Sequence, residues 1–180
     1  MAVSSIQTRV ASGPADTPQQ RLERLYRACR DDLYAYVASM LGERALAEDV
    51  TATAFERAFR RRRLFDARRG SERAWLFGIA RNAALDELRR RGRSAPLEDS
   101  AALAPADAAE DPGERAVRRA TVQAALAALS PRERELIALK FHAGLANPDI
   151  ARVLRVSESN AGTMLHRTIT KLRKACDEQA

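Results

Sequence analysis

The sequence predicts an all-α fold of two small helical domains joined by a flexible acidic linker. Most of the chain on either side of its middle repeats apolar residues at three- and four-residue steps, which is typical of amphipathic helices. No segment alternates apolar and polar residues as a half-buried strand does. The middle of the chain is rich in Ala, Asp and Pro without a sustained period, which indicates a linker.

The distribution of charge follows the same division. Residues 1–91 carry 18 Lys and Arg against 12 Asp and Glu, residues 92–113 carry 1 against 5, and residues 114–180 carry 12 against 7. We therefore expect a disordered tail at 1–18, a first domain at 19–91, a linker at 92–113 and a second domain at 114–180. The net charge of +7 favours a polyanionic partner such as nucleic acid, and a merely well-solvated basic surface is the alternative.

Several classes of protein do not fit this sequence. Cys29 and Cys176 lie far apart without CxxC spacing, and His142 and His166 have no acidic or cysteine partners at ligand spacing, so we expect no metal and no cofactor. No paired catalytic carboxylates, nucleophile with a base, or Gly-rich phosphate loop stands out, so we expect neither an enzyme nor a small-molecule substrate.

The sequence also predicts a cytoplasmic protein that does not contact a membrane. No apolar run approaches the roughly 20 residues that span a bilayer. The N-terminal segment lacks the apolar core of a signal peptide.

Three helices are expected in the first domain. The first carries apolar residues from Leu22 to Met40 and ends at Gly42. The second runs from about Ala45 to Arg63 and should bury Val50, Ala54, Phe55, Ala58 and Phe59. After a loop, Ser71 caps the third, which ends in LRRRGR. The arginine runs at the ends of the second and third helices fit DNA contacts, but the helix dipole alone also favours them.

The second domain contains the pattern of a helix-turn-helix. A helix at about 114–128 precedes a capping box, Ser130 to Glu133, with proline at the first helical position. Asn147-Pro148-Asp149 opens a short helix, and a three-residue break leads to a last helix that Ser157 caps. A plain helical hairpin is the alternative, but the capped, basic last helix favours DNA binding.

Three stretches together resemble a bacterial RNA polymerase sigma factor of the extracytoplasmic-function group of the sigma-70 family. The family helix that binds RNA polymerase resembles AEDVTATAFERAF (47–59). Its promoter-melting segment resembles FDARRGSERAWLFGIARNAALDELRRR (65–91), the most specific of the three. Its C-terminal DNA-binding domain resembles LSPRERELIALKFHAGLANPDIARVLRVSES (129–159).

The resemblance implies a transcription initiation factor that binds core RNA polymerase, at its clamp and flap regions, and promoter DNA. It leaves open whether an anti-sigma factor is a further partner. The residues that would contact the polymerase are Glu48, Asp49, Ala52, Thr53 and Glu56. Thr53 departs from the glutamate that is usual in the family, and local helix solvation would also explain Asp49. The acidic linker matches the family connector that lies in polymerase channels, although a solvated tether has the same composition.

The first domain would recognise and open the −10 element. Opening needs a pocket for a flipped base and cations for the displaced strand. The residues placed for this are Asp66, Arg68, Arg69, Arg73, Trp75, Arg81, Asn82, Arg89 and Arg90, and Arg91 would also follow the DNA backbone. Trp75 shares a helical stripe with Ile79 and Ala83, so core packing is the stronger interpretation of this residue than base stacking.

The second domain would read the −35 element through its last helix. The inward stripe is Ala161, Leu165, Ile169 and Leu172. The residues expected at DNA are Arg155, Ser157, Ser159, Asn160, Thr163, Arg167 and Lys171. Gly162 and Met164 stand where the common family pattern has cations, so we expect −35 binding that is weaker or differently specific. The similarity of Ser159 to Thr163 to a minority form of the family, SNxGT, supports a change of specificity.

Two other functions fit the same residues. A stand-alone helix-turn-helix regulator would bind a promoter without polymerase, with its first domain used for dimerisation or sensing. A protein of sigma ancestry that binds a partner without driving initiation is the other.

Overall fold

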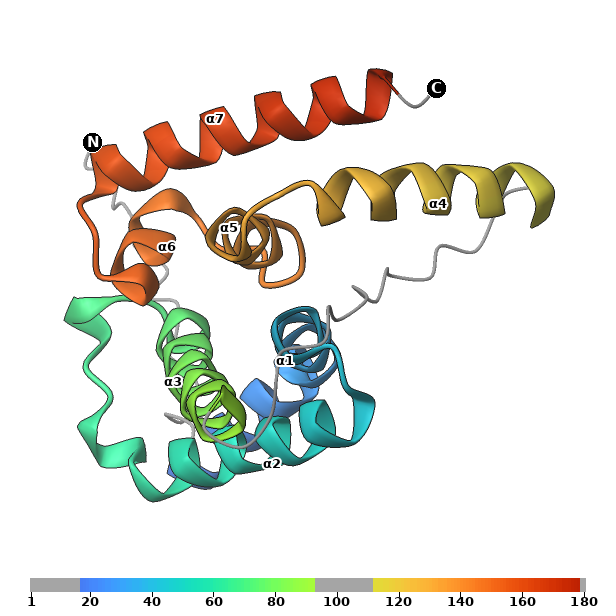
Figure 1. The fold of residues 1–180 in the computed structure, drawn as a ribbon. Coiled ribbons are helices and arrows are strands. Elements are labelled where there is room, and N and C mark those ends of the chain that lie inside the picture. The colour runs from blue at the N-terminus through green and yellow to red at the C-terminus, as the bar shows by residue number, and fades with distance from the viewer. Residues whose placement is uncertain (1–16, 93–111, 179–180) are drawn as a thin grey trace, which may run out of the picture.

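The computed structural model describes residues 17–92 and 112–178, and throughout these ranges the chain forms helices and short turns (Figure 1). The predicted all-α class is confirmed, with no strand in the described residues. The α-helices are α1 (Pro18–Leu41), α2 (Arg44–Arg60), α3 (Glu72–Gly92), α4 (Pro112–Ala127), α5 (Pro131–Phe141), α6 (Asn147–Leu154) and α7 (Glu158–Asp177). Most of the predicted tail and linker lies outside the described residues. None of the described helices is long and apolar enough to cross a membrane.

Local capping chemistry sets the ends of α1. Thr17 forms a capping box with Gln20, accepting from the Gln20 backbone N–H at 3.2 Å, and Pro18 occupies the first turn. Gly42 ends the helix in the left-handed conformation at φ +67°, which glycine adopts without a Cβ penalty. The helix therefore starts inside the segment expected as tail.

The structure corrects two predictions for the second helix, its end and the burial of Phe59. The α-helix stops at Arg60, because Arg61 leaves the helical region at φ −98° and ψ 9° and a 3₁₀ turn, Arg62–Leu64, follows. The predicted burial of Phe59 is wrong: its side chain is 41% exposed, and the Arg62 guanidinium lies 4.4 Å from its ring centroid. The other four residues expected in this core are buried.

The second half of the chain follows the predicted plan closely. Ser130 and Glu133 form the capping box of α5. α6 ends at Arg155, which adopts the left-handed conformation at φ +56°, and Ser157 then caps α7 by accepting from the Asn160 N–H at 3.2 Å. A short helix, a tight turn and a capped helix thus form a helix-turn-helix.

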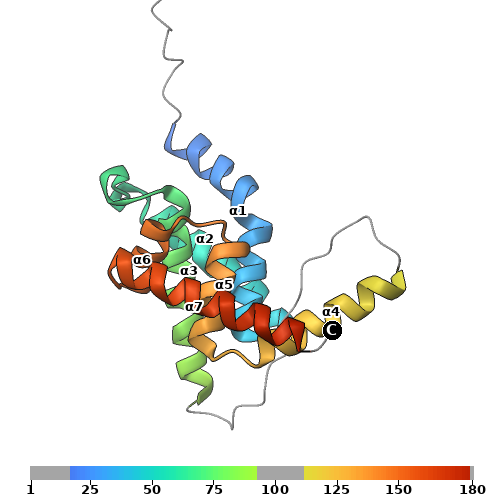
Figure 2. The same ribbon diagram turned by 90° about the horizontal axis from the view of Figure 1, so that it is seen from above.

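The helices gather into two lobes that touch each other. The first lobe is α1 to α3, and the second is α4 to α7. α5 packs against α1, and α6 packs against α3 (Figures 1 and 2). Buried apolar residues of both lobes form one continuous cluster, which includes Leu33 and Phe77 from the first and Leu139 and Ile150 from the second. The sequence did not predict this contact, which we call the closed arrangement.

Candidate nucleic-acid interface

A cavity of about 470 Å³ lies where the α2–α3 loop, α3 and α6 meet. Its walls include Asp66, Arg69, Trp75 and Asn82, four of the residues predicted to act on the −10 element. Arg155, predicted to contact the −35 element, lines the same cavity from the second lobe. The fold thus brings together residues that the sequence assigned to two separate DNA elements.

The loop that forms one wall is held by local bonds and by a close approach. The Asp66 carboxylate accepts from the Arg68 backbone N–H at 3.0 Å, which supports the 3₁₀ turn Ala67–Arg69. Gly70 adopts φ +143°, where side chains are strained. A Cβ on Gly70 would lie 3.2 Å from Nη1 of Arg152, so this position lets the loop approach α6.

Trp75 packs against the core, as the stronger interpretation of the sequence predicted, and it also lines the cavity. Its side chain is half-buried and packs against the core, and its ring centroid lies 5.6 Å from that of Phe65. Stacking of a base on this ring stays a prediction for experiment to test. Asn82 is exposed on α3, about two helical turns after Trp75 and one turn after Ile79, and all three line the cavity.

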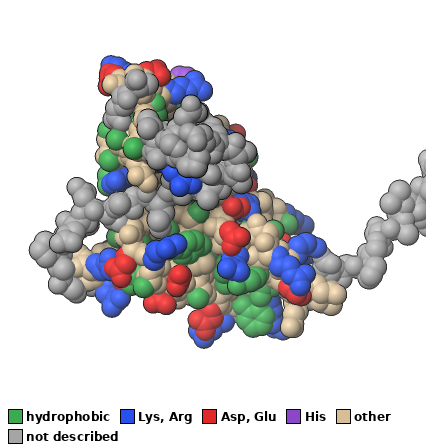
Figure 3. All heavy atoms as spheres, turned by 90° about the vertical axis from the view of Figure 1, so that its right-hand side faces the viewer, with side chains coloured by type: hydrophobic (Ala, Val, Ile, Leu, Met, Phe, Trp, Pro, Cys, Tyr) green, Lys and Arg blue, Asp and Glu red, His purple; other side chains and the backbone are tan. Residues whose placement is uncertain are grey.

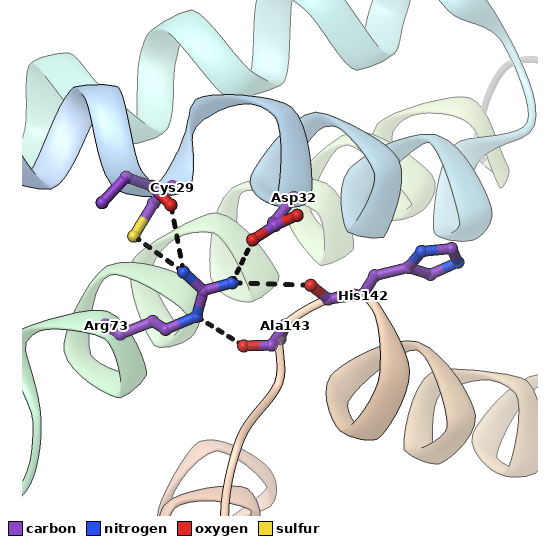
Figure 4. A network of polar contacts seen from close by, with 6 residues as sticks. Cys29, Asp32, Arg73, His142 and Ala143 are labelled. Carbon is purple, nitrogen blue, oxygen red and sulfur yellow. Dashed lines mark hydrogen bonds and ion pairs between the residues drawn. The ribbon is translucent and has the colours of Figure 1, made fainter. Parts of the chain in front are cut away.

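Arg73 is held at the contact between the lobes, and this differs from the predicted role of holding a phosphate. Its guanidinium forms an ion pair with Asp32 of α1 and donates from Nε to the Ala143 carbonyl oxygen at 2.5 Å (Figure 4). It also donates to the sulfur of Cys29 at 3.2 Å. Burial raises the pKa of the Cys29 thiol, and the neighbouring Arg73 charge only partly offsets this.

Arg81 is also engaged with the second lobe. Its Nε donates to Oε1 of Glu135 at 2.7 Å, and its Nη2 donates to Oε2 at 3.3 Å. The Tyr36 hydroxyl donates to the same carboxylate at 3.2 Å. Burial, followed by the Glu135 charge, holds the pKa of Tyr36 well above its ordinary value, so the hydroxyl remains a donor.

The basic end of α3 is exposed and locally paired. Arg89 pairs with Asp86 at 3.1 Å, and Arg90 pairs with Glu87 at 2.7 Å. The hydrogen bond from Arg90 is the main cause that lowers the pKa of Glu87. Figure 3 shows one face of the molecule, on which cationic and acidic side chains alternate over the first lobe. Such exposed pairs are weak and exchange readily for phosphate.

The residues predicted to bind polymerase share one face of α2. Glu48, Asp49, Ala52 and Glu56 are exposed, and Thr53 is half-buried. Their three- and four-residue spacing places them on neighbouring turns. Glu56 pairs with Arg60 at 2.5 Å, whereas no ion pair involves Glu48 or Asp49 within the described ranges.

The residues predicted to read the −35 element are all exposed, as a DNA-reading helix requires. They are Arg155, Ser157, Ser159, Asn160, Thr163, Arg167 and Lys171. Lys171 pairs with Glu133 of α5 at 2.9 Å. The buried side of α7 consists of Ala161, Leu165 and Thr168, of which Thr168 was not expected.

Sequence reasoning missed Glu135, which is buried between the lobes and only 8% exposed. One signal was available: Glu135 precedes Ala138 and Leu139 by three and four residues, and both are buried, so it shares their inner face. Sequence reasoning also missed Asp32, which pairs with Arg73, and Asp149, which accepts a hydrogen bond from Ser71.

In the part of the chain that is described, no group of three His, Cys, Asp or Glu could hold a metal.

Comparison with known proteins identifies the family of this chain. Residues 25–94 match the Sigma-70 region 2 family, and residues 119–172 match the Sigma-70 region 4 family. The chain is 31% identical to the ECF RNA polymerase sigma factor SigX of Bacillus subtilis, over 87% of this chain and 84% of the relative. It is 32% identical to the RNA polymerase sigma factor CarQ of Myxococcus xanthus, over 91% and 93%.

Further relatives differ in length or share mainly the fold. The ECF RNA polymerase sigma factor BldN of Streptomyces coelicolor is 28% identical over 96% of this chain, which spans 65% of that relative. The solved structure of the sigma factor RpoE from Bartonella quintana, in complex with the anti-sigma factor NepR, has a TM-score of 0.71 at 22% identity, covering 87% of this chain and 97% of that one. CnrH, in complex with the cytosolic domain of CnrY, has a TM-score of 0.64 at 24% identity, over 90% and 91%.

The fold and its exposed helix-turn-helix are therefore those of a sigma-type transcription initiation factor, a class that is not one of enzymes. The chain belongs to the sigma-70 family, in its extracytoplasmic-function group.

Proposed function

We propose that this sigma factor binds core RNA polymerase through the exposed face of α2 and directs it to specific promoters. The observation that supports this most directly is the pair of separate exposed surfaces: the acidic α2 face on one lobe, and the polar α7 face on the other. Exposed charges suit a partner that must dissociate, because their contribution is reversible and sensitive to salt. The polymerase clamp is the proposed partner of α2, and the flap that of the second lobe.

The first lobe is proposed to capture a base of the −10 element. Its cavity offers an amide from Asn82, an aromatic face from Trp75 and cations from the adjoining loop. An asparagine side chain both donates and accepts, so it can pair with a base edge, while Arg68 and Arg69 can hold the displaced strand. Arg89 and Arg90 would follow the duplex, which adds affinity without sequence information.

The second lobe is proposed to read the −35 element. Asn160, Thr163 and Arg167 lie on the exposed face of α7 and supply donors and acceptors for base edges in a major groove. Arg155 at the turn and Ser157 at the helix start are placed for phosphate contacts.

The proposal extends to the compartment of the protein and to a further protein partner. A promoter-binding factor works beside the chromosome, so we propose the cytoplasm as its compartment. Two solved relatives in this fold are bound to protein partners, and an anti-sigma protein is the proposed partner of that kind for this chain.

Run-off transcription with purified core polymerase tests the proposal against that of a stand-alone regulator. We expect promoter-specific transcripts and co-elution with core enzyme during size exclusion. Tight binding to duplex DNA alone, without transcripts or co-elution, would overturn the proposal.

Replacing Asn82 with alanine separates opening from docking. We expect Asn82→Ala to reduce open-complex formation at least about tenfold while co-elution with core polymerase stays unchanged, because Asn82 lines the cavity and belongs to α3 rather than to the proposed polymerase face of α2. The matched control is Asn160→Ala on α7, which should weaken duplex binding and leave binding to a pre-melted promoter intact. An equal loss of docking in Asn82→Ala would show that its assigned role is wrong.

A further inference from the structure

The carboxylate of Glu135 is buried, and its hydrogen bonds cross from one lobe to the other. Every hydrogen bond that it accepts within the described ranges comes from the first lobe: two from Arg81 and one from Tyr36. A buried carboxylate is stable only when it is paired, and removal of its partner is strongly destabilising. Glu135 therefore fits the interior of the closed arrangement, and opening would take it and Arg81 back to water.

Other polar contacts reinforce the closed arrangement at the start of α3. The Ser71 hydroxyl donates to Oδ2 of Asp149 at 2.8 Å, and Arg73 donates to the Ala143 carbonyl oxygen at 2.5 Å. These contacts adjoin the continuous apolar core that the lobes share. The contact between lobes thus combines apolar burial with satisfied hydrogen bonds, as a specific interface does.

The closed arrangement occupies groups that the first lobe would use on DNA. A guanidinium recognises carboxylate and phosphate in the same bidentate way, so Glu135 holds Arg81 as a phosphate would. The Arg73 donors are likewise taken up, and α6 places Arg152 and Arg155 at the cavity that holds Asn82. The second lobe thus covers part of the surface at which the promoter strand is proposed to bind.

We infer that the closed arrangement is an autoinhibited resting state of the free chain, and that Glu135 holds it shut. Its inhibitory consequence rests on the proposed function, whereas closure itself does not. A partner that binds only the open form has its apparent affinity reduced by the fraction of open molecules. The promoter strand would therefore bind to the first lobe by drawing the lobes apart.

Energy transfer between two dyes on the free protein measures closure without polymerase or DNA. Arg60→Cys on α2 and Lys174→Cys on α7 provide exposed labelling sites on opposite lobes. Cys176→Ser removes the accessible natural thiol, while Cys29 is buried and its raised pKa disfavours labelling. We expect one high-transfer population in the parent protein.

Glu135→Gln is the decisive variant, because it removes the charge and retains the shape. We expect the ratio of open to closed molecules to rise at least about tenfold, since Arg81 is left unpaired in the interface. The matched control is Glu133→Gln, because Glu133 lies on the same helix and its carboxylate contacts only its own lobe within the described residues, namely Lys171 and the Ser130 backbone N–H. This control should transfer energy as the parent does.

Tyr36→Phe provides a second test that does not change charge. It removes one hydrogen bond to Glu135 and should raise the open fraction by a smaller factor than Glu135→Gln. Circular dichroism and thermal melting confirm that each variant is folded. If folded Glu135→Gln and Tyr36→Phe both transfer energy as the parent does, Glu135 does not hold the lobes shut.

A disulfide tests the inhibitory consequence. Ser71→Cys combined with Asp149→Cys, with Cys176→Ser, places two thiols where a hydrogen bond now joins the lobes. We expect the oxidised protein to give at least about tenfold fewer run-off transcripts, restored by reduction. Equal yields in both redox states would overturn autoinhibition. Absence of transcripts from the parent protein would instead overturn the proposed function, and the energy-transfer result would still decide closure.

Discussion

At the scale of single residues, Arg155 combines an unfavourable backbone with a useful charge. It is the one non-glycine residue with positive φ within residues 17–92 and 112–178, at φ +56° in the turn of the helix-turn-helix. An L-residue there is disfavoured by about 1–2 kcal/mol because its Cβ approaches the following carbonyl. Its guanidinium is exposed beside the cavity and the start of α7. We interpret this as local strain retained for contact with nucleic acid.

Arg155→Gly should separate these two effects. We expect the free energy of unfolding to rise by about 0.5–1 kcal/mol. Relief of the backbone strain stabilises the folded state by more than the added conformational entropy of glycine stabilises the unfolded chain. Duplex binding should weaken at the same time through the lost cation. Arg155→Ala is the matched control, since it loses the cation and keeps Cβ. Urea unfolding and duplex titration measure both quantities, and equal stability of the two variants would contradict this explanation.

His142 should make stability depend on pH near neutrality. Burial lowers its pKa from the ordinary 6.5, and the charge of Asp32 only partly opposes this. As pH falls below about 6.5, the unfolded chain binds a proton that the folded protein does not, so stability is present above that pH and lost below it. The pKa values of Glu87 and Glu133 are lowered from the ordinary 4.5. These carboxylates therefore lose their contribution to stability only as pH falls below about 4.5.

Melting temperatures at pH 7.5 and pH 5.5 test this expectation. His142→Gln should reduce the fall in melting temperature between the two, because its side chain does not titrate. His166→Gln is the matched control, as this other histidine is exposed on α7 and should leave the fall unchanged. The explanation fails if the His142 variant keeps the full dependence on pH.

At the scale of elements, Gly162 and Met164 flank the exposed face of α7 and differ in how closely they pack against the rest of the protein. A Cβ on Gly162 would meet Nδ2 of Asn147 at 3.7 Å, an ordinary contact, so the structure leaves room for a side chain. Met164, by contrast, is half-buried and packs against the core. The two positions look alike in sequence, but only Gly162 can gain a cation without loss of packing.

Substitutions at these positions should therefore have different effects. Gly162→Lys should raise duplex affinity about threefold at moderate salt, through one added phosphate contact. It should also stabilise the protein by about 0.5–1 kcal/mol, because glycine is unfavourable within a helix. Met164→Arg should raise affinity but lower stability. Gly162→Ala is the control for helix propensity alone, and unchanged affinity of Gly162→Lys would count against this interpretation of α7.

At the scale of the whole molecule, the two proposed partner surfaces lie on different lobes. The face of α2 carries exposed acidic residues, while α7 presents a polar and basic face. The closed arrangement leaves both of these faces exposed and covers the groups between them. Initial contact with polymerase is therefore compatible with closure, and only promoter opening requires separation of the lobes.

Charge reversal on α2 tests the polymerase surface. Glu48→Lys combined with Asp49→Lys should abolish co-elution with core polymerase, because cations would face the site that acidic groups fit. The fold should persist, since both side chains are exposed and outside the core. Asp177→Lys with Glu178→Lys makes the same change at the end of α7 and should keep co-elution. Retained docking of the α2 variant would show that another surface binds polymerase.

The sequence by itself determined the helices, several of their ends and the outward face of α7. These depend on interactions within a few residues, such as the caps at Ser130 and Ser157 and the glycine at 42, whereas the cap at Thr17 and the end of α2 at Arg60 were not predicted. Motif similarity then predicted the family, which the comparisons confirm. The roles of individual DNA-facing residues remain predictions.

Only the tertiary structure decided which arginines are available and which are engaged. Arg73 and Arg81 resemble Arg68 and Arg69 in sequence, yet the former pair reach across to the second lobe. Their partners lie 70 and 54 residues away along the chain. Periodicity shows which face of a helix turns inward, but it does not show what covers that face. The closed arrangement, and with it the role of Glu135, therefore follows from the packing of two lobes that are distant in sequence.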